Sequence, residues 1–176
     1  MNELLVITAV GEDRPGIVDE LSHILFEANL NIEDSRMSIL GGEFAIILLV
    51  SGKAEALAKI QNEENKLGNA LRLKLLIKPT QAKQPHKDKI PYSIKVVGMD
   101  HPGIVHHLAR FMAQHQINIE DLETESYPAP HTGTPMFAVN MSVDIPGELS
   151  ISKVREEFIE LCDEHNLDAK FSPLEP

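Results

Sequence analysis

Histidines are the residues of this chain whose chemistry most readily suggests a metal or catalytic site. The chain has eight of them, and His101, His106 and His107 lie close together, with His115 a little further along. Metal ligation needs several side chains that converge on one point, and sequential helix residues such as His106 and His107 do not face one site. We therefore expect no metal and no cofactor, and we interpret these histidines as surface or interface residues.

Paired carboxylates and a single thiol are the other candidates for chemistry. Glu33–Asp34 and Glu120–Asp121 could suggest acid–base work, but neighbours on a strand point to opposite faces, so we expect solvated edge or interface charges. Cys162 is in helical phase with Phe158 and is expected to be a small core residue. The sequence has no Ser–His–Asp order, glycine-rich phosphate loop or Cys-x-x-Cys pair, which favours a protein that is not an enzyme.

A repeated segment is the strongest signal in the sequence. Residues 10–34 read VGEDRPGIVDELSHILFEANLNIED, and residues 97–121 read VGMDHPGIVHHLARFMAQHQINIED. The offset is 87 residues without a gap, and 12 of the 25 positions are identical. The identities fall in two clusters, G-x-D-x-P-G-I-V and N-I-E-D. Such repetition indicates two copies of one structural unit.

The first half of each copy predicts a strand followed by a helix. Residues 4–10 are apolar and β-branched, which favours a strand. Pro15 suits the first turn of a helix, and Asp13 and Asp100 are candidates for capping the two helices. Apolar residues at helical spacing follow in both copies. The N-I-E-D cluster then begins a second strand.

The second half of each copy predicts a hairpin, a helix and a last strand. In the first copy the hairpin turns at Gly41–Gly42, because glycine tolerates the positive φ of tight turns. An amphipathic helix over 54–67, with Gly68 as its C-terminal stop, leads to a strand over 71–77. The order is βαββαβ. We therefore predict an α+β fold of two tandem ferredoxin-like units, each an antiparallel four-stranded sheet with two helices on one face.

The expected domain boundaries follow from a polar segment between the copies. Residues 1–79 form the first domain, residues 80–90 an exposed linker and residues 91–176 the second domain. The hairpin connection of the second copy is longer and spans 128–134. We expect it either to cover an interface or to be a tolerated surface insertion.

The composition excludes some classes of partner. The 176 residues are 43% hydrophobic and 24% charged, and 27 acidic against 16 basic residues give a formal net charge of −11. Clusters of Lys and Arg, which bind nucleic-acid backbones and anionic membranes, are missing, so we expect neither partner. The N-terminal MNELLVITAV has no basic region or cleavage site, and one cysteine suits a reducing compartment. We expect a cytoplasmic protein.

The pattern of a strand, G-x-D-x-P-G-I, a helix, N-I-x and a further strand within a βαββαβ unit resembles the ACT domain. The resemblance covers nearly the whole chain as two tandem copies, and D-R-P-G-I-V at 13–18 followed by N-I-E-D at 31–34 carries it. Two such copies with nothing else attached resemble the glycine cleavage system transcriptional repressor group of bacterial proteins.

The resemblance implies a ligand site near the interface of paired domains, where the loop after the first strand and the asparagine of the second strand contribute. A helix N-terminus offers free N–H groups, glycine admits a carboxylate, and asparagine can contact either end of a zwitterion. Turn and capping chemistry uses the same residue types, and that alternative stays open. The residues implied are Gly11, Asp13, Arg14, Pro15, Gly16, Ile17, Asn31 and Ile32 in the first copy and Gly98, Asp100, His101, Pro102, Gly103, Ile104, Asn118 and Ile119 in the second.

The function implied by the resemblance is an amino-acid-responsive regulator that acts through protein–protein contact. Glycine is among the candidate effectors, a transcription activator is the candidate protein partner, and side-by-side pairing of sheets could give a homodimer. The alternative is a detached allosteric subunit of an amino-acid metabolic enzyme. An enzyme in its own right comes third: a folate-linked hydrolase carries a similar N-terminal unit, but this chain ends where a catalytic domain would begin.

Overall fold

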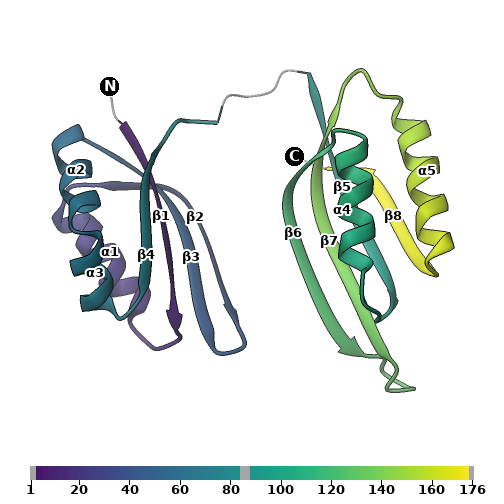
Figure 1. Ribbon diagram of the computed structural model, residues 1–176, viewed down its shortest axis with the longest axis horizontal. Coiled ribbons are helices and arrows are strands. Elements are labelled where there is room, and N and C mark those ends of the chain that lie inside the picture. Colours follow the sequence, from purple (N-terminus) through teal and green to yellow (C-terminus); the bar gives the residue numbers. More distant parts are fainter. Residues whose placement is uncertain (1–2, 84–87, 175–176) are drawn as a thin grey trace. The chain divides into compact units, whose positions relative to one another are not determined.

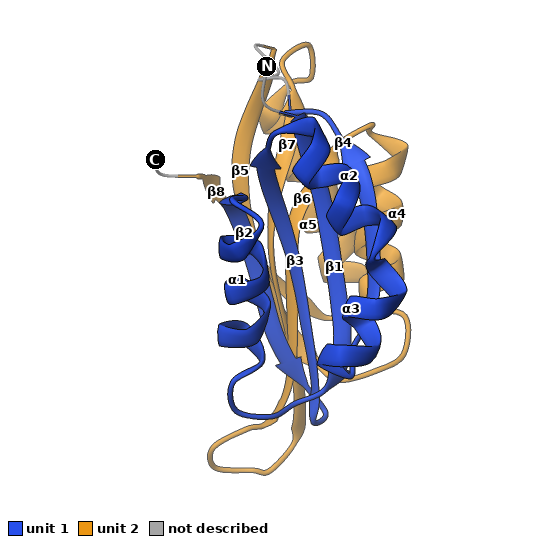
Figure 2. Cartoon of the chain, turned by 90° about the vertical axis from the view of Figure 1, so that its left-hand side faces the viewer, with its two compact units in different colours: residues 1–84 blue, residues 85–176 orange. Residues whose placement is uncertain are grey.

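Each copy of the repeat folds into its own antiparallel four-stranded sheet with helices on one face (Figure 1). The computed structural model describes residues 3–83 and 88–174, so residues 84–87 of the expected linker lie outside the described residues. The chain divides into two units, residues 1–84 and 85–176 (Figure 2). The predicted fold class, two tandem ferredoxin-like βαββαβ units, is confirmed.

The first unit has the predicted order of elements, with one helix divided. Its strand order across the sheet is β2-β3-β1-β4, with all neighbours antiparallel, so β2 and β4 are the edges. The helices cover one face of this sheet (Figure 2). The elements are β1 (Glu3–Glu12), α1 (Ile17–Glu27), β2 (Asn31–Leu40), β3 (Glu43–Gly52), α2 (Ala54–Asn62), α3 (Glu64–Leu71) and β4 (Lys74–Thr80).

The second unit repeats the topology with strand order β6-β7-β5-β8. The long hairpin connection is confirmed between β6 and β7, where the Ala129 N–H donates to the Thr134 carbonyl over 2.9 Å. The elements are β5 (Lys89–Met99), α4 (Ile104–Gln114), β6 (Asn118–Pro128), β7 (Pro135–Pro146), α5 (Ile151–Glu164) and β8 (Leu167–Pro173).

Each unit has its own hydrophobic core between its sheet and its helices. In β1 the alternate residues Leu5, Ile7 and Ala9 are buried, as the strand period of two requires. Burial of one such leucine or isoleucine side chain contributes roughly 1.5–3 kcal/mol. Phe158 and Cys162 of α5 are fully buried in the second core, so the prediction that Cys162 is a core residue is confirmed.

The start of the first helix in each unit differs from the prediction. Helix α1 begins after Gly16, which has φ +91°, and α4 begins after Gly103, which has φ +100°. Neither helix has a side-chain hydrogen bond at its cap, so the expected capping by Asp13 and Asp100 was wrong. The chain enters each helix through a left-handed residue, a conformation that glycine adopts without steric cost.

The helix predicted over 54–67 is two helices, because α2 ends at Asn62 and α3 begins at Glu64. Gly68 lies inside α3 and does not end it. A Cβ on Gly68 would lie only 2.8 Å from the Leu73 carbonyl oxygen, so close packing against the chain after the helix requires glycine there. The helix ends instead at Leu71, and the next residue, Arg72, has φ +58°.

Candidate functional site

The connection between the first strand and the first helix is the centre of the candidate site in each unit. It follows β1 in the first unit and β5 in the second, and Gly11 and Gly98 are the second-last residues of these strands. A Cβ on Gly11 would lie 2.8 Å from Leu73 Cδ2 and 3.0 Å from the Arg72 carbonyl oxygen. Glycine is therefore required near the end of β1 by the close approach of the chain between α3 and β4, whether or not a ligand binds beside it.

The middle of each connection is a turn fixed by backbone hydrogen bonds. The Asp13 N–H donates to the Gly42 carbonyl over 3.0 Å, and the Asp100 N–H donates to the Pro135 carbonyl over 2.9 Å. Asp100 also accepts a hydrogen bond from the Ser126 hydroxyl over 2.9 Å. Each turn is thereby tied to the hairpin of its own unit.

The end of each connection presents a helix start. Pro15 and Pro102 precede the left-handed glycines. The Gly16 carbonyl accepts the Glu20 N–H over 2.9 Å, and the Gly103 carbonyl accepts the His107 N–H over 3.0 Å. The next residues, Ile17 and Ile104, are both 2% exposed and belong to the core, so only backbone groups of these two positions can serve a ligand.

Arg14 and Glu20 form an ion pair beside the turn of the first unit. Arg14 Nη1 donates to Glu20 Oε1 over 2.7 Å, and Nη2 donates to Oε2 over 2.6 Å. Nη2 also donates to the Leu71 carbonyl at the end of α3 over 3.2 Å. The hydrogen bond with Arg14 lowers the pKa of the Glu20 carboxyl, and the same bond raises the pKa of Arg14.

Histidines replace this ion pair in the second unit. His101 stands at the position of Arg14 and His107 at the position of Glu20. The His107 ring stacks on His165 with a centroid separation of 4.1 Å and lies edge-on to His106 at 5.6 Å. Burial lowers the pKa of His107, and the nearby His165, His106, His101 and Arg110 lower it further.

The asparagines of the motif begin strands and do not end helices. The left-handed residues that follow α1 and α4 are Asn29, with φ +53°, and Gln116, with φ +55°. The alternative of turn chemistry, in which Asn31 and Asn118 would be the left-handed residues ending these helices, was therefore wrong. Asn31 Nδ2 donates to Glu33 Oε1 over 3.0 Å, and Asn118 makes the same bond to Glu120.

Glu33 lies at an irregularity of the edge strand. The pairing register of β2 shifts between Ile32 and Asp34, so the strict alternation expected for Glu33 and Asp34 is interrupted. Glu33 also accepts a hydrogen bond from the buried Ser51 hydroxyl, and the bonds from Ser51 and Asn31 lower its pKa. Sequence reasoning missed Ser51, because only strand pairing brings it opposite Asn31.

The loop and the asparagine of one unit lie at opposite ends of the sheet. Asn31 pairs with Ser51, which pairs with Leu4 near the start of β1, whereas the loop follows Glu12 at the other end. At about 3.3 Å per strand residue, the two groups are roughly 25 Å apart. A small ligand cannot touch both within one unit.

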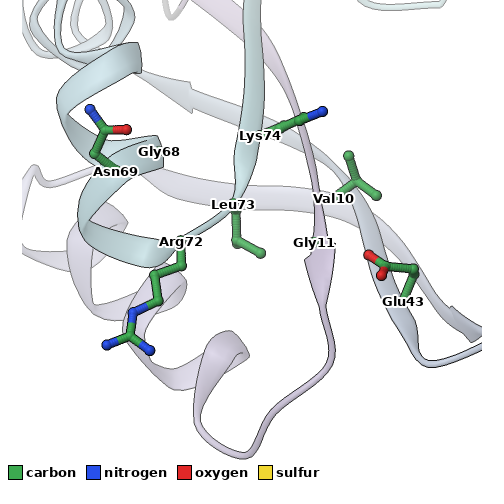
Figure 3. Close-up of a pocket in the computed structure, with 8 residues that line it drawn as sticks. All are labelled: Val10, Gly11, Glu43, Gly68, Asn69, Arg72, Leu73 and Lys74. Carbon is green, nitrogen blue, oxygen red and sulfur yellow. The ribbon is translucent and has the colours of Figure 1, made fainter.

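A hollow of about 410 Å³ lies beside the loop of the first unit, between the ends of β1 and α3 and the starts of β3 and β4 (Figure 3). Gly11 is the one residue of the predicted site that lines it. Its other lining residues were not predicted, because packing of α3 and β4 brings them to the loop. They are Val10, Glu43, Gly68, Asn69, Arg72, Leu73 and Lys74.

The described residues contain neither a metal-binding cluster nor a membrane-spanning helix. Within 3–83 and 88–174, no three or more His, Cys, Asp and Glu side chains are arranged to hold a metal ion. His115 is engaged by Glu157 at 2.8 Å and by the Phe111 carbonyl at 3.0 Å. Over the same two ranges, every helix is too short or too polar to cross a membrane.

The two copies match one family model, which describes the ACT domain, over residues 3–78 and again over residues 93–172. The chain belongs to the ACT-domain family. It is a tandem ACT-domain protein, and it resembles the glycine cleavage system transcriptional repressor group.

That resemblance extends over almost the entire chain. The glycine cleavage system transcriptional repressor of Escherichia coli (strain K12) is 30% identical over 162 residues, or 92% of this chain and 85% of that protein. A solved structure of an unknown protein from Galdieria sulphuraria has a TM-score of 0.83 at 29% identity and covers 99% of this chain and 100% of that one. Another, described as a candidate glycine cleavage system transcriptional repressor, has a TM-score of 0.74 at 26% identity over 100% and 99% of the two chains.

Proposed function

We propose that this tandem ACT protein is an amino-acid-responsive regulator that acts through contact with another protein. The observation that carries the proposal is the match to a transcriptional repressor over 92% of the chain, with both ACT copies included. A regulator of this kind needs a ligand site and a partner surface, and it needs no catalytic group. We propose accordingly that the chain is not an enzyme and that it works in the cytoplasm.

The route to transcription in this proposal is a protein partner, for which a transcription activator is the candidate. The net charge of −11 opposes association with a nucleic-acid backbone. An effector regulates such a partner only if it binds the two states of the protein with different affinity. The proposal therefore requires that amino-acid binding alters the surface that the partner contacts.

The effector site in this proposal is the loop between the first strand and the first helix. Its backbone N–H groups suit the carboxylate of an amino acid. Glycine is among the candidates because the chain resembles a glycine cleavage system transcriptional repressor. The asparagine that contacts the ligand would come from a second copy of the chain, because the loop and the asparagine of one unit are roughly 25 Å apart. All ten residues of the edge strand β2 are exposed, including Met37 at 50% and Leu40 at 75%. A long exposed edge strand presents unpaired backbone N–H and C=O groups, which favour pairing with another strand.

Antiparallel pairing of two β2 edges would bring together the groups that one unit keeps apart. The start of one β2 would lie beside the end of the other, so Asn31 of one copy would approach the loop of its neighbour. The same reasoning applies to β6 and Asn118. This arrangement makes a homodimer part of the proposal.

Calorimetric titration of the purified chain with a panel of amino acids, glycine first, tests the proposal. We expect saturable binding that weakens at least about tenfold when the contributing asparagine is removed by Asn31→Ala or Asn118→Ala, which is the loss of one hydrogen bond to a charged group. Asn140→Ala, which removes an exposed asparagine from the middle of β7, is the matched control and should bind as the wild type does. Failure of every amino acid to bind would contradict the sensor proposal.

A further inference from the structure

The two loops that the proposed function treats as effector sites carry different charge patterns. Residues 11–20 contain four acidic residues and one arginine, whereas the matching residues 98–107 contain one acidic residue and three histidines. The backbone of the turn is the same in both, because Gly16 and Gly103 have nearly equal φ angles of +91° and +100°. The units therefore present one backbone cradle with two different electrostatic environments.

In the first unit the cation of the loop is already neutralised from within. Both terminal nitrogens of Arg14 bind Glu20, at 2.7 and 2.6 Å, and one of them also binds the Leu71 carbonyl at 3.2 Å. Two parallel bonds of this kind are the strongest ion-pair geometry that arginine makes. These bonds use three of the five N–H donors of the guanidinium, and Glu20 already offsets the positive charge that would attract an incoming carboxylate.

The same carboxylate lies over the turn itself. Glu20 Oε1 is 3.7 Å from the point where a Cβ on Gly16 would stand. Asp19 adds a second acidic residue to the first turn of α1. Both charges complement the partial positive charge of the helix start, and both repel a further anion. The first loop thus contains its own carboxylate.

In the second unit no acidic residue occupies the first turn of α4. His106 and His107 stand where Asp19 and Glu20 stand in α1, and His101 stands where Arg14 does. His165 approaches from the end of α5 and stacks on His107 at 4.1 Å. A neutral imidazole has one N–H donor and a protonated one has two, so these side chains can donate to a carboxylate where Glu20 would oppose it.

We propose that Glu20 closes the loop of the first unit to carboxylate ligands and that the loop of the second unit, with His101 and His107, is the one that takes the effector. The inference rests on the proposed function for the existence of an effector, and it adds which unit binds it and which residue decides. Each chain would then bind one effector molecule rather than two. The first unit would contact the protein partner or a second copy of the chain.

Exchange of the pair Arg14 and Glu20 with the pair His101 and His107 tests this inference. Calorimetry measures the number of binding sites per chain, and the ligand is the amino acid that binds the wild type most tightly. We expect one site per wild-type chain. The variant Arg14→His with Glu20→His should gain a second site, and the variant His101→Arg with His107→Glu should lose at least about tenfold in affinity, the effect of one charge-assisted hydrogen bond. Glu63→His with Lys66→His, at an ion pair of 3.7 Å elsewhere in the first unit, should change neither quantity.

The outcomes separate the inference from the function on which it rests. Two equal sites in the wild type, or exchanges that leave stoichiometry and affinity unchanged in proteins with wild-type circular dichroism, would overturn the assignment to the second unit and leave the sensor proposal standing. If the second exchange does not fold, the gain of a site in the first variant decides alone. Absence of binding in every protein would overturn the proposed function and the inference together.

Discussion

At the scale of single residues, the environment of His107 determines how the second unit responds to acid. Burial and four neighbouring groups, His165, His106, His101 and Arg110, lower its pKa below the ordinary value of 6.5. The neutral imidazole is therefore favoured in the folded state. The folded protein binds fewer protons there than the unfolded chain as the pH falls through the ordinary histidine range.

This linkage predicts that the second unit loses stability on mild acidification. The contribution of His107 to folding stability is fully present above pH 6.5, and it declines as the pH falls toward the lowered pKa of the folded state. Thermal unfolding between pH 8 and pH 5.5 should show a falling midpoint, and His107→Gln should flatten that fall. His131→Gln, in the exposed β6–β7 connection, should leave it unchanged. A wild-type midpoint independent of pH in this range would contradict the prediction.

Sequence identity between the copies located the loops but not the partners of their side chains. The motif residues Arg14 and Asn31 could be named from the repeat. Glu20, Leu71 and Ser51 could not, because α1, α3 and β3 bring them to these residues only in the folded unit. One signal was present in the sequence: Arg14 and Glu20 change together into His101 and His107, as paired residues do.

At the scale of elements, sequence reasoning misjudged the turn into the first helix and the divided helix after β3. The order of the strands and the Gly41–Gly42 hairpin could be predicted, although the last strand of the first unit begins at Lys74 and not at residue 71. Proline and aspartate suggested an ordinary capped helix start, whereas the chain enters α1 through Gly16 at φ +91°. A positive φ leaves no trace in the sequence except the glycine itself, and glycine occurs for other reasons too, as Gly68 shows by its packing.

This turn predicts that any residue with a Cβ at position 16 lowers the free energy of unfolding, because the backbone there has a positive φ. The nearest atom to such a Cβ is 3.7 Å away, so there is no steric overlap to relieve. Gly16→Ala should lower the unfolding free energy by about 1–2 kcal/mol, the penalty of the left-handed region for a residue with a side chain. Urea denaturation measures it. Gly16→Asn should lose less, because asparagine tolerates this region better, and an alanine variant as stable as the wild type would contradict the conformation.

At the scale of the whole molecule, repetition determined the architecture and local substitutions determine how the two units differ. The 87-residue offset was sufficient to predict two βαββαβ units. It could not show that the first sheet exposes apolar residues on the face away from its helices, where Ile47 is 47% and Leu76 57% exposed. An alternating pattern indicates a strand with one buried face. It does not show which strands have apolar residues on both faces of the sheet.

We propose that a small amino acid binds at a loop between the first strand and the first helix of a unit, and that the second unit provides this loop. The most direct test is a ¹H–¹⁵N correlation spectrum of the labelled chain, titrated with glycine and then with the other amino acids. We expect saturable chemical-shift changes that concentrate in residues 98–107 and are smaller in the matching residues 11–20. Shifts confined to other surfaces, or no shift with any amino acid, would contradict it.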